Sequence, residues 1–170
     1  MAKKNLKYFI PGAIALVLGI AAFCMMFLEA VKYTAELGIA SPGYSYTGMQ
    51  LAFGYTETIG EGALSVGTKV LSFNTFAFLA FFLPLIGGVL ALLFKNGLIT
   101  KIITTACFVV GAVLLFSIVG YAKMGMSDAQ QVLVENLTNS MGVGPIVAGV
   151  VSIIGAVVCF FKGTLAKIFK

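Results

Sequence analysis

The sequence predicts an all-α membrane protein: four transmembrane helices in an antiparallel bundle, with a small β-containing extracytoplasmic cap and a short amphipathic outer helix. Hydrophobic residues make up 60% of the 170 positions and charged residues only 10%, whereas soluble domains carry about 25% charged residues. Four uncharged apolar runs are long enough to cross a bilayer, and most lysines gather on one side of them. We therefore expect residues 1–170 to form a single membrane domain.

The four apolar runs contain between 19 and 22 residues each. At about 1.5 Å per residue, the first run reaches about 31 Å as a helix, which matches a hydrocarbon core of about 30 Å. A signal peptide has a shorter apolar region that ends in small residues, whereas this run ends in bulky ones, so we expect it to remain as a helix. The runs are Tyr8–Leu28, Phe73–Phe94, Ile102–Tyr121 and Val143–Phe161, and the expected spans are 8–28, 73–94, 99–121 and 143–161.

Lysine placement predicts the orientation of the spans. Seven lysines and no acidic residue lie in the segments 1–7, 95–98 and 162–170, and an eighth, Lys101, lies on the same side at the start of the third span. Three lysines and all six acidic residues lie in the loops 29–72 and 122–142, which carry a net charge of −3. Because lysine-rich segments stay in the cytoplasm, we expect a multi-pass cell-membrane protein with both termini cytoplasmic. All basic residues are lysines, which is typical of an AT-rich genome and favours a bacterial membrane.

The residue types that are missing exclude several functions. There is no histidine, tryptophan or arginine, which excludes imidazole catalysis, histidine-bound metals and arginine clamps. The four runs contain no charged residue, whereas ion-coupled transporters need one at membrane depth. Cys24, Cys107 and Cys159 lie without a paired motif, and we expect them to fill space as free thiols. We therefore predict no catalytic residue, no cofactor, no metal site and no enzyme activity.

The net charge of +5 comes from lysines scattered at the predicted membrane edges. Such lysines contact anionic lipid headgroups, and they lack the clustering with aromatic residues that nucleic-acid binding uses. We expect the lipid bilayer as a partner, a homo-oligomer or another membrane protein as a possible second one, and no nucleic acid.

Small residues form a stripe along the last predicted helix. A residue of this kind recurs every four positions, so one face of the helix is nearly free of side-chain bulk. Such a stripe lets two helix backbones approach closely in lipid, and it could serve packing within the chain or between chains. The assembly residues are Gly144, Ala148, Ser152 and Ala156, with Gly149 and Gly155 beside them.

Pro84 lies in the middle of the second predicted helix and is followed by Gly87 and Gly88. Proline removes a backbone hydrogen bond, so we expect a kink here. A kink can mark the moving part of a channel, although packing alone also accounts for kinks in membrane helices.

The first outer loop is expected to begin as a continuation of the first helix to Leu37, because Glu29, Lys32 and Glu36 have helical spacing. Alternating apolar residues from Met49 to Tyr55, and again from residue 64 to 70, predict a pair of strands with a turn at 57–62. The candidate contacts of this cap are Tyr44, Tyr46, Phe53 and Tyr55.

The second outer loop contains a sequence typical of a helix start, Ser127 followed by Gln130 at the third position. Val132, Leu133 and Leu137 then share one helical face. We expect a short amphipathic helix from Asp128 to Thr138 at the outer membrane surface.

This organisation resembles that of claudin-type tetraspan proteins: both ends cytoplasmic, a long first outer loop with strands, a tight inner turn and a shorter second outer loop. The outer-loop signature of that family is a tryptophan, a Gly-Leu-Trp run and two cysteines, and this chain has no tryptophan and no cysteine outside the apolar runs. The resemblance therefore concerns topology and assigns no residue a role.

The function predicted from these features is structural, scaffolding or accessory. The chain would self-associate or bind a partner through its helix seams and its outer cap. The alternative is a small channel, or a transport protein for lipids or small molecules, with the Pro84 kink as its gate.

Overall fold

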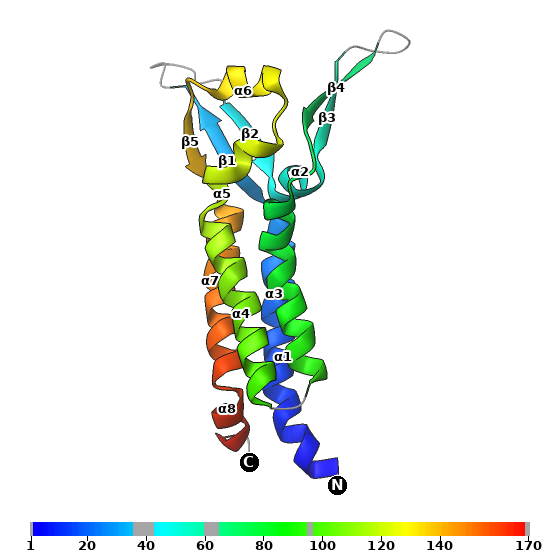
Figure 1. Cartoon of the computed structure of the whole chain (residues 1–170), viewed down its shortest axis with the longest axis vertical. Coiled ribbons are helices and arrows are strands. Elements are labelled where there is room, and N and C mark those ends of the chain that lie inside the picture. The colour runs from blue at the N-terminus through cyan, green and yellow to red at the C-terminus, as the bar shows by residue number, and fades with distance from the viewer. Residues whose placement is uncertain (1, 36–42, 60–64, 95–96, 169–170) are drawn as a thin grey trace.

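The computed structural model describes residues 2–35, 43–59, 65–94 and 97–168, and it shows an elongated molecule (Figure 1). Four long helices lie side by side along the long axis, and strands and short helices form a cap at one end (Figure 1). The four helices are long and apolar enough to cross a membrane. They are α1 (Ala2–Cys24), α3 (Thr75–Leu93), α4 (Leu98–Phe116) and α7 (Val143–Phe160).

Each long helix packs against two others. Helix α1 contacts α3 and α7, and α4 contacts the same two helices from the other side. Small residues and the large ring of Phe108 are buried between the helices, whereas Val17, Ile102 and Val113 are exposed on the outside. Close packing of small residues, with bulky apolar side chains turned outward, suits helices surrounded by lipid.

The cap contains two antiparallel sheets. One has three strands in the order β2-β1-β5, and the other is the hairpin of β3 and β4. Strand β1 pairs with β5 from Val31 opposite Met141 to Thr34 opposite Thr138, so the two outer loops share one sheet. The strands are β1 (Glu29–Thr34), β2 (Gly43–Thr47), β3 (Tyr55–Ile59), β4 (Val66–Leu71) and β5 (Thr138–Met141).

The remaining elements are short helices in the cap and at the far end of the molecule. They are η1 (Met25–Phe27), α2 (Gly48–Phe53), α5 (Ile118–Tyr121), η3 (Ala122–Gly125), α6 (Asp128–Val134) and α8 (Lys162–Ile168).

The predictions of a mostly helical chain, of four apolar helices and of a small sheet are confirmed. The third long helix ends at Phe116, earlier than the predicted Tyr121, and the chain continues through Ser117 into α5. The turn-forming segment at residues 95–96 and residues 36–42 and 60–64 of the first outer loop lie outside the described residues.

The predicted continuation of the first helix to Leu37 is wrong over residues 29–34. Helix α1 ends at Cys24, and residues 29–34 form strand β1 instead. Ala30, Val31 and Tyr33 are buried in the cap core, which a strand paired on both sides allows. Glu29 and Lys32 form an ion pair of 2.6 Å, as their spacing suggested, but they do so within a strand. The pairing of β1 with β2 has a register shift between Glu29 and Val31.

The predicted strand from Met49 to Tyr55 is also wrong in its first part. Residues 48–53 form helix α2, whose start is stabilised by a reciprocal cap. Thr47 Oγ1 accepts from the Gln50 N–H at 3.2 Å, and Gln50 Oε1 accepts from the Thr47 N–H at 2.9 Å. Gly54 ends the helix at a φ of +90°, a conformation that favours glycine, and the first strand of the hairpin starts only at Tyr55.

The second outer loop differs from prediction in three ways. Helix α6 ends at Val134, and residues 138–141 join the sheet as β5. The Ser127 side chain makes no hydrogen bond to the start of α6. The Gln130 side chain, which the predicted helix start would pair with Ser127, instead bonds to the Tyr46 hydroxyl. Helix α6 lies at the end of the cap farthest from the long helices (Figure 1), and its exposed side chains include Val132 and Leu133.

Candidate functional site

The small-residue stripe of α7 is buried within the chain. A Cβ atom added at Gly144 would lie 2.7 Å from the carbonyl oxygen of Met25, so the α7 backbone touches η1, directly after the end of α1. The Ser152 hydroxyl donates to the Ala148 carbonyl at 2.7 Å and needs no partner from another chain. The stripe residues buried in this way are Gly144, Ala148, Gly149, Ser152, Gly155 and Ala156.

Two glycines of the stripe pack against aromatic rings of α4. A Cβ atom at Gly155 would lie 2.5 Å from the Phe108 ring, and one at Gly149 would lie 2.6 Å from the Phe116 ring. On the opposite side of Phe108, a Cβ atom at Gly87 of α3 would lie 3.1 Å from the same ring. Phe108 is fully buried, so glycines of two helices form the slot that holds it.

Pro84 lies at the contact of three helices. Helix α3 continues through it without interruption from Thr75 to Leu93. A Cβ atom at Gly111 of α4 would lie 2.7 Å from the proline ring, and one at Gly19 of α1 would lie 2.6 Å from the Pro84 carbonyl oxygen. Gly88, one turn further on, packs as closely against the Ala15 carbonyl of α1. The predicted kink residues therefore pack directly against both neighbouring helices.

Two of the predicted cap contacts have quite different surroundings. Tyr46 of β2 is only 6% exposed, and its hydroxyl accepts a hydrogen bond of 2.7 Å from Gln130 Nε2 of α6. The ring of Tyr33 of β1 packs edge-on against Tyr46 with the centroids 6.3 Å apart. Burial raises the pKa of both tyrosines to about 12, so both hydroxyls stay protonated at neutral pH. Tyr46 is thus a core residue, whereas Tyr44 on the same strand is 43% exposed.

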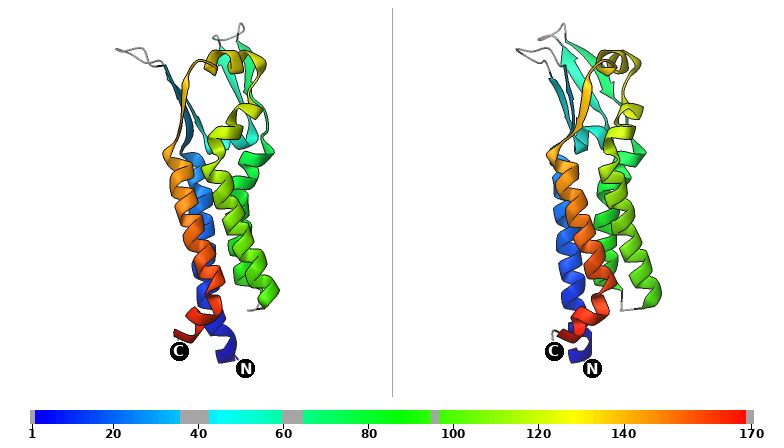
Figure 2. Two further views of the ribbon diagram at one scale, coloured as in Figure 1. Left: turned by 60° about the vertical axis from the view of Figure 1, so that its left-hand side comes forward. Right: turned by 90° about the vertical axis from the view of Figure 1, so that its left-hand side faces the viewer.

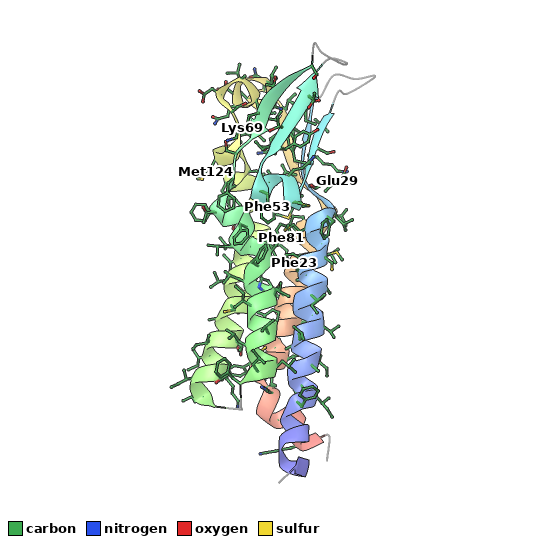
Figure 3. All side chains as sticks on the ribbon, turned by 90° about the vertical axis from the view of Figure 1, so that its right-hand side faces the viewer. Phe23, Glu29, Phe53, Lys69, Phe81 and Met124 are labelled. Atoms are coloured by element: carbon green, nitrogen blue, oxygen red, sulfur yellow. The ribbon has the colours of Figure 1, made fainter. Side chains whose placement is uncertain are left out.

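Phe53 and Tyr55 flank the turn that leads from α2 into the hairpin. Phe53 lies where the cap meets the long helices (Figure 3), and its ring packs edge-on against Phe78 of α3 with the centroids 5.7 Å apart. It is nevertheless 48% exposed, and Tyr55 is 37% exposed. Of the four predicted contacts, Tyr44, Phe53 and Tyr55 therefore remain on the surface.

Asn74 joins the cap to the long helices and was not singled out from the sequence. Its side-chain oxygen accepts from the N–H groups of Phe76 and Ala77 at 3.1 and 3.3 Å, which caps the start of α3. Its Nδ2 donates to the Tyr121 carbonyl of α5 at 3.0 Å. Asparagine before an apolar run is a recognised cap signal, but the link to α5 depends on tertiary structure.

Lys162 has a structural role at the other end of the molecule. Its ammonium group is buried and donates to the Ala91 and Phe94 carbonyls at the end of α3, at 2.5 and 3.0 Å. A cation is favourable at a helix C-terminus, although burial lowers the pKa of Lys162. The sequence placed this lysine among those that contact lipid headgroups, whereas its donors satisfy helix carbonyls.

Within the described part of the chain, no three cysteine or acidic side chains come close enough together to bind a metal ion. No protein-family model matches the chain, and no curated protein matches it. The class of protein therefore follows from the fold alone. Four apolar helices of this length indicate a multi-pass membrane protein.

Proposed function

We propose that this chain is a four-span membrane protein with a structural, scaffolding or accessory role. The helices insert as an antiparallel bundle with both termini in the cytoplasm, and the outer cap binds a second copy or another membrane protein. The observation that carries the proposal is the contrast between the two parts of the molecule. The helices are tightly packed and bury their small-residue faces within the chain, whereas the cap exposes aromatic side chains and strand edges.

The hairpin of β3 and β4 supports an association role for the cap. It stands apart from the three-stranded sheet (Figure 1), and an isolated two-stranded hairpin is marginally stable in water. A bridge between Leu71 and Met126 ties its base to the second outer loop. Unpaired strand edges and exposed aromatic residues such as Tyr44 and Tyr55 are features through which proteins recruit partners.

The packing around Pro84 favours this role over the channel alternative. A gate at Pro84 would have to separate helix backbones that now lie in contact through Gly19, Gly88 and Gly111. Channels also line their pore with polar or charged groups, and the four apolar runs contain no charged residue. Single-channel currents in planar bilayers that change in Pro84→Ala would instead support the alternative.

Cysteine labelling tests the proposed orientation. In a background without the native cysteines, Ser45→Cys and Val132→Cys are expected to react with a membrane-impermeant maleimide on intact cells, because both positions are exposed on the cap. Lys167→Cys, which is exposed at the other end, is expected to react only after lysis. Labelling of Lys167→Cys in intact cells would contradict the orientation. Gln130 is unsuitable for this test because it is buried.

Particle mass tests the association of the cap. The protein extracted in polymer-bounded nanodiscs is expected to be heavier than one 17.9 kDa chain with its lipid. Replacing both Tyr44 and Tyr55 by serine is expected to weaken the association by about tenfold or more, because exposed aromatic residues are frequent energetic centres of interfaces.

The matched control is Phe9→Ser, which removes a similarly exposed aromatic residue at the end of α1 far from the cap. It is expected to leave the mass unchanged. A wild-type particle that contains one chain and no other protein would contradict association through the cap, and so would equal masses for the wild type and the double variant.

A further inference from the structure

A groove runs along the surface between α4 and the end of α7, opposite the cap. Its volume is about 590 Å³, and Thr164 of α8 is among its lining residues. At this end of the molecule, α4 diverges from α7 (Figure 2). In the orientation proposed above, the groove faces the cytoplasmic leaflet of the membrane.

The groove is apolar along its length and polar at one end. Its walls include Ile102 and Val109 of α4 and Phe160 of α7, while Lys101 and Thr164 lie at the end nearest α8. Lysine at the cytoplasmic end of an apolar groove between membrane helices suits an anionic lipid headgroup. The ammonium group of the neighbouring Lys162 already donates to carbonyls at the end of α3. Among the residues that line the groove, Lys101 is the cation that can contact a ligand.

The start of α4 adds to the positive charge at this end of the groove. Leu98, the first residue of α4, lines the groove, and Gly97 before it provides no side-chain cap. The first backbone N–H groups of a helix have no partner within the helix and carry partial positive charge. They therefore reinforce the effect of the Lys101 ammonium group on a negatively charged ligand.

Thr105 lies in the groove one helical turn deeper than Lys101. Residues four apart share a helix face and are separated by about 6 Å along the axis. The Thr105 hydroxyl oxygen is covered by the protein, so Thr105 serves the groove as part of its wall. A phospholipid placed with its phosphate at Lys101 would bring its ester carbonyls to the depth of Thr105 and its acyl chains to the apolar part of the groove.

We propose that the groove is a binding site for one anionic phospholipid of the cytoplasmic leaflet. The phosphate lies at Lys101, the ester region of the lipid lies at the depth of Thr105, and an acyl chain follows Ala106 and Val109 toward the middle of the membrane. The proposal rests on the membrane insertion proposed above, but it is independent of what the cap binds.

The test uses the full chain reconstituted into vesicles of phosphatidylglycerol and phosphatidylethanolamine in equal amounts with identical acyl chains. Native mass spectrometry after gentle extraction counts the lipids that each variant retains. The wild type is expected to retain phosphatidylglycerol over phosphatidylethanolamine by about fivefold, the factor that one lysine contact with an anionic lipid supplies.

Two variants address the two halves of the site. Lys101→Ala is expected to abolish the preference for phosphatidylglycerol, and Ala106→Phe is expected to fill the groove and abolish retention of the lipid. Lys167→Ala removes an exposed lysine of α8 at the same end, and Val113→Phe adds bulk to an exposed position of α4 outside the groove. Both controls are expected to behave as the wild type does.

The outcomes separate this site from the membrane insertion on which it rests. Resistance of the protein to carbonate extraction from the vesicles is measured first, and a protein that carbonate releases would contradict insertion itself. An inserted protein without a preference for phosphatidylglycerol would overturn the lipid site alone. Equal effects of Lys101→Ala and Lys167→Ala would also overturn it, because they would show general attraction to the surface instead of a site.

Discussion

Replacing Phe108 by alanine is expected to lower the free energy of unfolding by about 3 to 5 kcal/mol, the range for removing a large buried ring. The cost lies at the high end for this chain because the slot around the ring cannot collapse. Gly155 and Gly87 face the ring from two helices and have no side chains that could move into the space. Unfolding in detergent micelles, followed by helix content against denaturant, measures the change.

A compensating substitution distinguishes the slot from a general loss of hydrophobic surface. Gly155→Leu alone is expected to destabilise the protein, because its Cβ atom would overlap the Phe108 ring. Combined with Phe108→Ala, the leucine side chain enters the vacated slot, and the double variant should be more stable than either single one. Phe9→Ala, which removes an exposed ring from α1, serves as the control with little effect. Simple addition of the two single losses would contradict direct contact between these positions.

Gly142→Ala is expected to be nearly as damaging, with a loss of about 3 kcal/mol from overpacking. Gly142 stands between β5 and α7, and its N–H donates to the Ala30 carbonyl at 2.8 Å. A Cβ atom here would overlap the backbone carbonyl group of Glu29, so β1 would have to shift. The backbone conformation of Gly142, with φ −75° and ψ 170°, is open to any residue, so the whole cost comes from this contact.

Gly120→Ala is the matched control for this substitution. Gly120 lies in α5, and a Cβ atom added there meets no atom within 4 Å, so alanine should be neutral or should stabilise the short helix. The melting temperature in micelles measures both variants, and labelling of a cysteine at Ser45 reports whether the cap loosens. Equal melting temperatures for Gly142→Ala and Gly120→Ala would contradict the close contact between β1 and the start of α7.

The sequence alone determined the four long helices, because they depend on local composition. A run of about 20 uncharged apolar residues can satisfy its backbone in lipid only by forming a helix. The small residues of α7 were visible for the same reason, since their spacing is a property of one helix. The sequence left open whether the stripe packs within this chain or against another chain. Only the tertiary structure shows that Gly144 packs against Met25 and Gly155 against Phe108.

The cap was decided by tertiary contacts. Residues 29–34 have the charge spacing of a helix, yet they form a strand because β2 and β5 satisfy their backbone and bury Tyr33. The β5 partner lies about a hundred positions away: Thr34 and Thr138, which are paired in the sheet, are separated by 104 residues. Gln130 likewise makes no local pair with Ser127 at the start of α6. Its side chain forms a buried hydrogen bond to Tyr46 instead. Local propensities differ by a few tenths of a kcal/mol per residue, so pairing and burial with distant partners outweigh them and select the structure of the cap.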